Sequence, residues 1–199
     1  MKKILFLISM FGLFVVASCN SNKQTNSNGE KLDMVWNEKV QDTFYVLRLD
    51  DSLDVNTIVA TLESHGFWFN ERYSSEDCLR FRSQQSEYFT FGGLGFEMLD
   101  IFRNDGILTG VRFMNSSKDK SSSLHVYSGI KNTMDSKCSP TSVTLNDTTV
   151  YAVTRYYGKN KVCATVSCFR YESVGKEILI GTKLEYFKLN ALGGPSDEL

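Results

Sequence analysis

Five cysteines and two histidines are the residues of this chain whose types could support covalent or metal chemistry. Four of the cysteines lie in the body of the sequence: Cys78, Cys138, Cys163 and Cys168. The sequence contains no Cys-x-x-Cys and no His-x-x-x-His pair, so the spacings typical of a metal site are absent. A cysteine nucleophile needs a histidine beside it, and Cys138 and His125 fall near opposite ends of one predicted helix, about 20 Å apart. We therefore expect no catalytic residue, no metal and no cofactor, and we interpret His65 and His125 as structural.

The fifth cysteine, Cys19, ends an N-terminal targeting segment. Lys2 and Lys3 provide a positive start, and residues 4–17 are uncharged and mostly apolar. This stretch has the length of a signal-peptide core and is shorter than the roughly 20 apolar residues of a membrane-spanning helix. Val16-Ala17-Ser18-Cys19 resembles the bacterial lipobox, in which the thiol of the cysteine receives a diacylglycerol. We predict that residues 1–18 are a lipoprotein signal peptide and that Cys19 is the lipidated, membrane-anchored N-terminus, with acyl chains such as palmitate.

The segment after Cys19 is polar. Residues 20–30 contain no apolar side chain, and we predict that residues 19–40 form a flexible tether. The tether is rich in Asn and Ser and resembles those of Bacteroidetes lipoproteins, in which an acidic run after the cysteine marks export to the cell surface. Such a run is absent here, which implies a periplasm-facing protein on the outer or inner membrane. The formal net charge of −1 provides no basic field, so nucleic acid is not expected as a partner.

The four internal cysteines leave two interpretations open. An oxidising envelope permits disulfides between them, and the alternative is four buried free thiols. If residues 162–171 form one strand, Cys163 and Cys168 lie on opposite faces of it, about 16 Å apart. A disulfide needs Cα atoms within about 7 Å. Any bridge would therefore pair Cys163 with Cys78 or Cys138.

The first part of the chain predicts a strand, a helix and a hairpin. Residues 43–49 have the aromatic and aliphatic composition of a strand. Val55, Ile58, Val59 and Leu62 form one helical apolar stripe. Asp54 is placed to cap that helix and Gly66 to end it. The aromatic cluster Phe67, Trp68, Phe69 and Tyr73 could line a ligand or partner surface, but we favour its packing in the core.

A second set of turns and strands follows. Gly92-Gly93 fits a turn between short strands, and Asn104-Asp105-Gly106 is a strong hairpin signal between residues 96–103 and 107–114. Residues 115–123 are rich in Ser, Lys and Asp and contain no apolar side chain, which suggests an internal boundary. Ser123 could cap a second amphipathic helix ending near Lys137. The remaining strands are predicted at 143–145, 149–157, 162–171 and 178–187, and the tail 191–199 is expected to be disordered.

This order of elements predicts an α+β domain over residues 41–190. We expect antiparallel β-sheet meanders with two amphipathic helices packed on one side, because each helix must bury its apolar stripe against a sheet. Each half of the domain reads as a helix followed by a meander. The two similar half-domains would be residues 41–114 and 123–190.

Several short motifs resemble those of a group of small, uncharacterised Bacteroidetes envelope lipoproteins. The helix ending in His65-Gly66-Phe67, the strand end Phe91-Gly92-Gly93 and the strand Gly110-Val111-Arg112-Phe113 carry the resemblance, which covers about residues 43–187. The helix-plus-meander halves are similar to the beta-lactamase-inhibitor-like fold, whose members bind proteins. Bacteroidetes O-glycosylate Asp-Ser/Thr followed by an aliphatic residue or Thr. Asp51-Ser52-Leu53 and Asp147-Thr148-Thr149 match this pattern, which marks Ser52 and Thr148 as candidate glycosylation sites.

These observations predict a non-catalytic envelope lipoprotein that binds a protein, a ligand or an envelope partner. One alternative is an inhibitor or immunity protein that neutralises a periplasmic toxin. The other is an enzyme of unrecognised type acting on cell-wall or glycan substrates, for which His125 would be the residue to test.

Overall fold

The computed structural model describes residues 24–25, 31–32, 35–143 and 147–189. The chain divides into two compact units, Met1–Asp33 and Met34–Leu199. In the first unit, β1 (Gln24–Thr25) and β2 (Lys31–Leu32) form an antiparallel pair. Cys19, the predicted signal peptide and the tail 191–199 lie outside the described residues. The second unit contains all the other elements and is described below.

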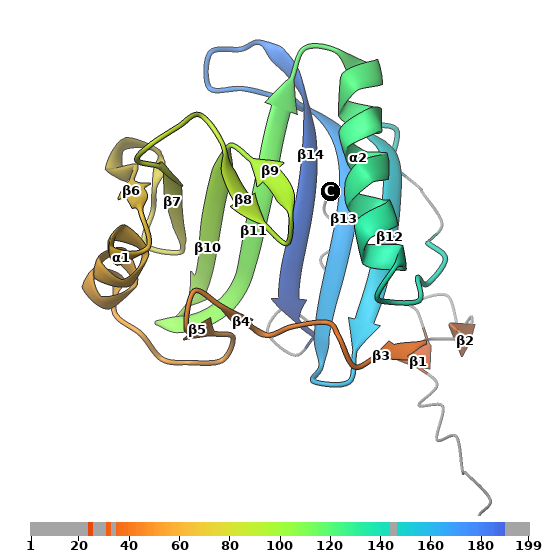
Figure 1. Cartoon of the computed structure of the whole chain (residues 1–199), viewed down its shortest axis with the longest axis horizontal. Helices are drawn as coiled ribbons and strands as arrows, with labels where there is room; N and C mark the ends of the chain where they lie inside the picture. The colour runs from red at the N-terminus through yellow and green to blue at the C-terminus, as the bar shows by residue number, and fades with distance from the viewer. Residues whose placement is uncertain (1–23, 26–30, 33–34, 144–146, 190–199) are drawn as a thin grey trace, which may run out of the picture. The chain divides into compact units, whose positions relative to one another are not determined.

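One eight-stranded sheet forms the framework of the second unit (Figure 1). Its strands, in spatial order, are β3 (Trp36–Asn37), β12 (Val150–Gly158), β13 (Val162–Glu172), β14 (Ile178–Lys188), β11 (Ile107–Ser117), β10 (Met98–Asn104), β7 (Cys78–Ser83) and β6 (Phe67–Phe69). Every neighbouring pair is antiparallel except β3 and β12. The expected α+β class with an antiparallel sheet is confirmed. Because β3 already belongs to the sheet, the folded unit begins before residue 41.

The two expected half-domains are not confirmed. Strand β14, from the second half of the chain, pairs with β11, from the first half, over eight residue positions from Gly110↔Phe187 to Ser117↔Ile180. The two halves therefore share one continuous sheet. The local pattern of a helix followed by strands is real, but the pairing between halves is a long-range contact that this pattern does not encode.

Helix α1 (Val55–Ser64) begins and ends where the sequence predicts. The carboxylate of Asp54 accepts a hydrogen bond from the Thr57 backbone N–H at 2.9 Å, which satisfies an N–H that has no partner within the helix. After the helix, Gly66 adopts a φ of +83°. Glycine adopts this left-handed conformation at little cost in free energy, because it has no side chain. Ile58 and Leu62 are fully buried, so the apolar stripe faces the core.

Helix α2 (Lys120–Asp135) begins earlier than predicted. Asp119, rather than Ser123, is its N-cap and accepts hydrogen bonds from the backbone N–H groups of Ser121 and Ser122. Ser123 is instead buried inside the first turns, and Thr182 donates a hydrogen bond to its carbonyl oxygen at 3.0 Å. The polar stretch 115–123 is therefore not a linker, since it contains the end of β11 and the start of α2.

Two tight turns differ in how well the sequence predicts them. The hairpin between β10 and β11 is confirmed, with Asp105 and Gly106 at φ of +50° and +79°. The single strand expected over 43–49 is wrong. It is a small hairpin of β4 (Thr43–Phe44) and β5 (Leu47–Arg48), whose turn residues Tyr45 and Val46 also have positive φ, +48° and +66°.

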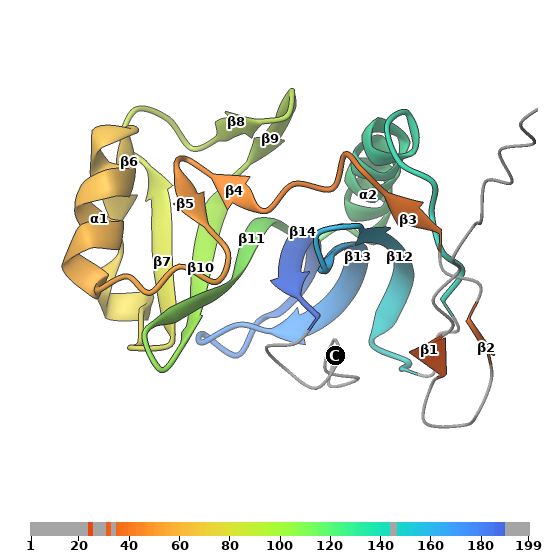
Figure 2. The ribbon, with the colours of Figure 1, turned by 90° about the horizontal axis from the view of Figure 1, so that it is seen from below.

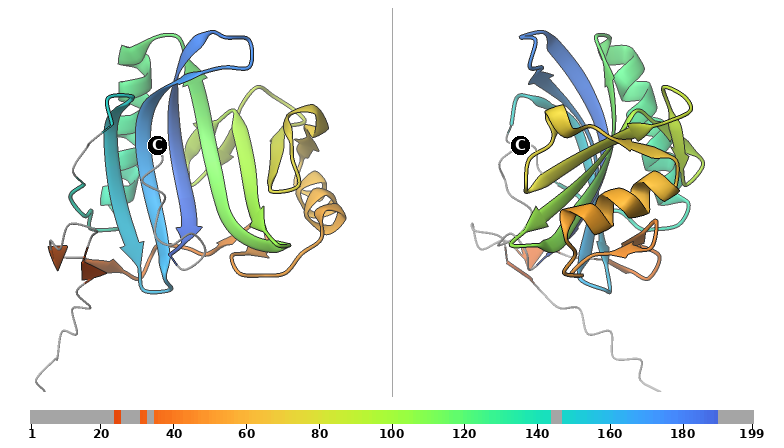
Figure 3. Two further views of the ribbon diagram at one scale, coloured as in Figure 1. Left: turned by 180° about the vertical axis from the view of Figure 1, so that it is seen from behind. Right: turned by 90° about the vertical axis from the view of Figure 1, so that its left-hand side faces the viewer.

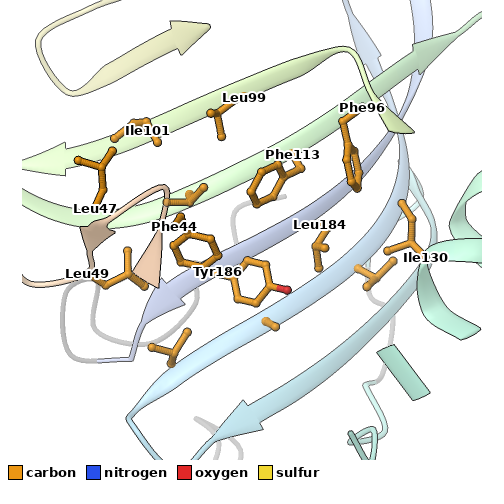
Figure 4. Packing of buried hydrophobic residues seen from close by; sticks show 14 of the residues in the cluster. Phe44, Leu47, Leu49, Phe96, Leu99, Ile101, Phe113, Ile130, Leu184 and Tyr186 are labelled. Atoms are coloured by element: carbon orange, nitrogen blue, oxygen red, sulfur yellow. The ribbon is translucent and has the colours of Figure 1, made fainter. Parts of the chain in front are cut away.

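The core lies on one face of the sheet, which we call the core face. Helix α2, the β4–β5 hairpin and the hairpin of β8 (Phe89–Phe91) and β9 (Leu94–Phe96) lie over this face (Figure 2). Phe44, Phe113 and Tyr186 meet here from three different elements (Figure 4). Burial of each large apolar side chain contributes about 1.5–3 kcal/mol. Both helices contribute buried residues to this one cluster, as expected for helices on one side of a sheet.

Candidate ligand-binding groove

The opposite face of the sheet, which we call the helix-free face, carries a row of charged side chains. Neither helix of the second unit lies over the middle of this face (Figure 3). Arg80 of β7, Asp100 of β10, Arg112 of β11 and Glu185 of β14 are direct register partners across four neighbouring strands. Because side chains of opposed residues share a face, these four groups form one continuous line, called the charged row below.

Ion pairs connect the whole charged row. Arg80 donates from Nε to Asp100 Oδ1 at 2.7 Å, and Arg112 donates from Nε to Asp100 Oδ2 at 3.0 Å. Arg112 also donates from Nη1 to Glu185 Oε1 at 3.3 Å, and Lys183 Nζ lies 2.7 Å from Glu185 Oε2. The Asp100 side chain is fully buried. Each carboxylate is thus shared by two cations, which compensates for the loss of its hydration.

The surroundings raise the pKa of Arg80 and of Arg112 and lower that of the neighbouring Lys183. The hydrogen bonds to Asp100 raise the pKa of Arg80. Burial lowers the pKa of Arg112, but the attraction of Asp100 and Glu185 outweighs that effect and the pKa is raised. For Lys183, burial is the larger effect and its pKa is lowered, despite the opposing attraction of Glu185. Lys183 is therefore the cation that the site holds least firmly in its charged form.

A groove of about 1020 Å³ lies on the helix-free face next to the charged row. One wall is the end of β6 and the short 3₁₀ helix η1 (Glu71–Tyr73), and the other is the turn between β13 and β14. The floor consists of Arg80 and Arg82 of β7, Met98 of β10 and Met114 of β11. Arg80 belongs to both the floor and the charged row, so the row fixes one edge of the groove.

The rims of the groove expose large apolar side chains. Trp68 and Tyr73 on one wall are 51% and 45% exposed, and Val174 on the other is 87% exposed. The expectation that the aromatic cluster packs in the core is therefore wrong for Trp68 and Tyr73, whereas Phe67 is buried as expected. The strand alternation of β6 explains the difference between Phe67 and Trp68, because neighbouring residues of a strand point to opposite faces. Tyr73 belongs to η1.

Glu97, between β9 and β10, lies beside both the groove and a second pocket. Its carboxylate accepts a hydrogen bond from the Ser116 backbone N–H at 3.2 Å. Burial raises its pKa, and this effect exceeds the opposing hydrogen bond and the attraction of Arg82.

The second pocket, of about 500 Å³, lies between β9 and α2 and includes His125 and Ser122. Within residues 35–143 and 147–189, no hydrogen bond joins the His125 ring to a hydroxyl, thiol or carboxylate.

The other predicted residues are dispersed. His65 donates from Nδ1 to the Thr61 carbonyl oxygen at 2.8 Å, a contact at the end of α1. Ser52 and Thr148 are both exposed, on separate loops. Trp36 is half-buried in β3, where its ring lies 6.4 Å from that of Tyr157.

The four internal cysteines are free thiols in the structure. Cys163 and Cys168 lie on opposite faces of β13, the arrangement that the strand spacing predicts: Cys168 packs in the core cluster, and Cys163 contacts Thr165 on the helix-free face. Burial raises the pKa of the thiols of Cys78, Cys138, Cys163 and Cys168. A raised pKa disfavours the reactive thiolate.

Within the described ranges, no group of three or more His, Cys, Asp or Glu side chains could hold a metal ion. In the same part of the chain, no helix has the length and apolar character needed to cross a membrane. Comparisons with protein-family models, with curated proteins and with solved structures return no match.

The groove and the charged row could not be identified from the sequence motifs. Their residues come from six strands, η1 and the connecting segments, and each contributes only one to three residues. One signal was available: charged residues recur at every second position of predicted strands, as in Arg80 and Arg82 or Lys183 and Glu185. Such alternation indicates a second, polar face of a sheet.

Proposed function

We propose that this chain is a periplasm-facing lipoprotein, anchored through Cys19, that binds a protein partner in the groove of the helix-free face. It acts as a binding module rather than as an enzyme. The lipobox-like Val16-Ala17-Ser18-Cys19 supports the anchor, and the groove supports the binding function. The partner is a protein that presents apolar side chains to the groove.

The composition of the groove is the observation that carries the proposal. Its lining includes Trp68, Tyr73 and Tyr171, three arginines, and the methionines Met98 and Met114, whereas it contains no lysine and no aspartate. Trp, Tyr, Met and Arg are the residue types enriched in protein–protein interfaces, whereas Lys, Asp, Glu and Ser are depleted there. The aromatic, methionine and arginine side chains of the lining therefore favour an interface, and its three glutamates and two serines do not. Methionine side chains adapt to irregular partner surfaces. Three arginines and three glutamates line the groove, so its charge is balanced.

Removal of the exposed aromatic rims tests the binding function. The full chain, solubilised from the envelope in detergent, should co-purify one partner in a stable ratio, and the Trp68→Ala/Tyr73→Ala variant should lose it. Ile107→Ala is the matched control, because Ile107 is 42% exposed at the far end of β11, about 23 Å from Met114 along the strand. Equal recovery of the partner with all three proteins would exclude the groove as its binding site.

The anchor has a separate test. Cys19→Ala should move the protein from the membrane fraction to the soluble fraction, because a single stably acylated residue is the only anchor proposed. A Cys19→Ala protein that still sediments with membranes would contradict the anchor and leave the groove experiment unaffected. The enzyme alternative predicts a hydrolytic activity on cell-wall or glycan substrates that His125→Ala abolishes.

A further inference from the structure

The charged row extends beyond Glu185 towards the other edge of the sheet. Thr165 of β13 is the register partner of Glu185, and Arg155 of β12 is the partner of Thr165. One step along the strands, Ser167 is the partner of Lys183. Arg155, Thr165 and Ser167 therefore lie side by side on the helix-free face, with Lys183 next to them. This cluster, called the Arg155 cluster below, is separate from the groove.

Arg155 differs from the other cations of this row of side chains, because Arg80, Arg112 and Lys183 each contact a carboxylate. Both carboxylates of the row are already shared: Asp100 by Arg80 and Arg112, and Glu185 by Arg112 and Lys183. Arg155 forms no ion pair with any residue of the described ranges. The nearest titratable group on β13 is the Cys163 thiol, which burial keeps protonated by raising its pKa. Among the described residues, the positive charge of Arg155 therefore has no carboxylate partner.

Two polar atoms of the same cluster lack a hydrogen-bond partner. The Ser167 side chain is fully buried, and its Oγ has no partner. The Nε of Arg155 is also buried without a partner. Nearly all buried polar groups in proteins are hydrogen-bonded, so a group without a partner points to a molecule that completes the site. A hydroxyl and a guanidinium can both donate, so a group that completes either of them can be an acceptor.

We propose that the Arg155 cluster binds an oxyanion, either a carboxylate or a tetrahedral phosphate or sulfate. Arg155 would supply charge-assisted hydrogen bonds and Ser167 a hydroxyl donor, while Thr165, 7% exposed, lies between them. Lys183 lies on the next strand, where its ammonium is paired with Glu185. Arg155 is half-buried, whereas Ser167 is fully buried. This proposal rests on the cluster itself and not on the groove or the anchor.

Anion-dependent stabilisation tests the site. The full chain in detergent is melted in increasing inorganic phosphate or acetate, with chloride keeping the ionic strength constant. Binding to the folded state should raise the melting temperature with concentration in at least one series, and the series that responds distinguishes a tetrahedral anion from a carboxylate. Arg155→Gln should abolish the rise. Arg170→Gln, which changes an exposed arginine of the same hairpin, should keep it. No rise in either series, or an equal rise in Arg155→Gln, would overturn the proposal.

Ser167→Ala provides a second test, because a ligand-binding role and a structural role of Ser167 predict opposite changes in the melting temperature without anion. Without anion, the variant should melt at the same temperature as the wild type or higher, because a buried hydroxyl without a partner is removed. With anion, its apparent dissociation constant should rise about tenfold, as expected for the loss of one charge-assisted hydrogen bond. A lower melting temperature without anion, together with unchanged anion affinity, would show that Ser167 has a structural partner and would overturn its role in the site.

Discussion

The two faces of the sheet are built from alternate residues of the same strands, yet they are buried by different means. On β13, Val162, Ala164, Val166 and Cys168 join the apolar core, and Cys163, Thr165 and Ser167 lie on the helix-free face. All seven are buried. The core face excludes water with the side chains of α2 and two small hairpins. The helix-free face relies on ion pairs, with Asp100 and Glu185 each shared between two cations.

This difference indicates what each face is for. A buried ion pair stabilises a protein no more than well-packed apolar residues would, so the charged row is not needed for stability alone. It holds Arg80 in a fixed position at the edge of the groove. We interpret the core face as the source of stability and the helix-free face as a rigid recognition surface.

The largest expected effect is the loss of Asp100. Asp100→Ala leaves Arg80 and Arg112 without their shared carboxylate and should lower the free energy of unfolding by about 3–5 kcal/mol. Phe113→Ala, on the core face, should cost a similar amount, about 3–5 kcal/mol. Urea unfolding of both variants measures this, with Asp77→Ala as an exposed-carboxylate control. A cost for Asp100→Ala of no more than about 1 kcal/mol would place the row among ordinary surface ion pairs.

Tyr45, beside the core, and Lys183, on the helix-free face, should contribute pH dependences of opposite sign. Burial raises the pKa of Tyr45, beside the core, to about 12, from 10.0. The folded state then retains the proton while the unfolded state releases it, so stability falls as the pH rises above about 10. Lys183 has a lowered folded pKa, so its contribution to stability grows as the pH rises towards 10.5. From pH 9 to 11, Tyr45→Phe should lose less stability than the wild type, and Lys183→Met should lose more. The reverse order would contradict these assignments.

A smaller effect is expected at the β4–β5 turn that covers the core face. Val46 is β-branched and 74% exposed, with a φ of +66°. Left-handed backbone costs such a residue about 1–2 kcal/mol, and glycine adopts it freely. Val46→Gly should therefore raise the free energy of unfolding by about 1 kcal/mol, measured by urea unfolding. A decrease would show that the Val46 side chain makes contacts worth more than the strain.

The smallest structural change concerns the cysteines. Because the four internal thiols are free, a denatured Cys19→Ala protein should titrate as four thiols with or without reductant. In the native state, Cys78 should react first, since it alone of the four is only half-buried. A count that rises on reduction would show a disulfide and revive the pairing of Cys163 with Cys78 or Cys138.

Local signals in the sequence predicted elements but not the site. The cap at Asp54, the turn at Asp105-Gly106 and the alternation in β12 to β14 are encoded by neighbouring residues, and all three were identified. The turn at Tyr45-Val46 was missed because neither residue is typical of positive φ. The charged row cannot be predicted from neighbouring residues, because Asp100 contacts Arg80 and Arg112 only through the register of three paired strands. The sequence Phe67-Trp68-Phe69 contains no polar residue to mark its exposed face, and the pairing of β6 with β7 shows that Trp68 lies on the face of Arg82.

Site-specific photo-crosslinking tests the central claim, that the groove of the helix-free face binds a protein, most directly. The photoreactive residue p-benzoylphenylalanine is placed at Tyr73 on the groove rim or at Ile107, two positions of similar exposure, 45% and 42%. In living cells, the probe at position 73 should give a discrete protein adduct that Trp68→Ala weakens, and the probe at position 107 should give none. Equal adducts from both positions, or none from position 73, would contradict the account.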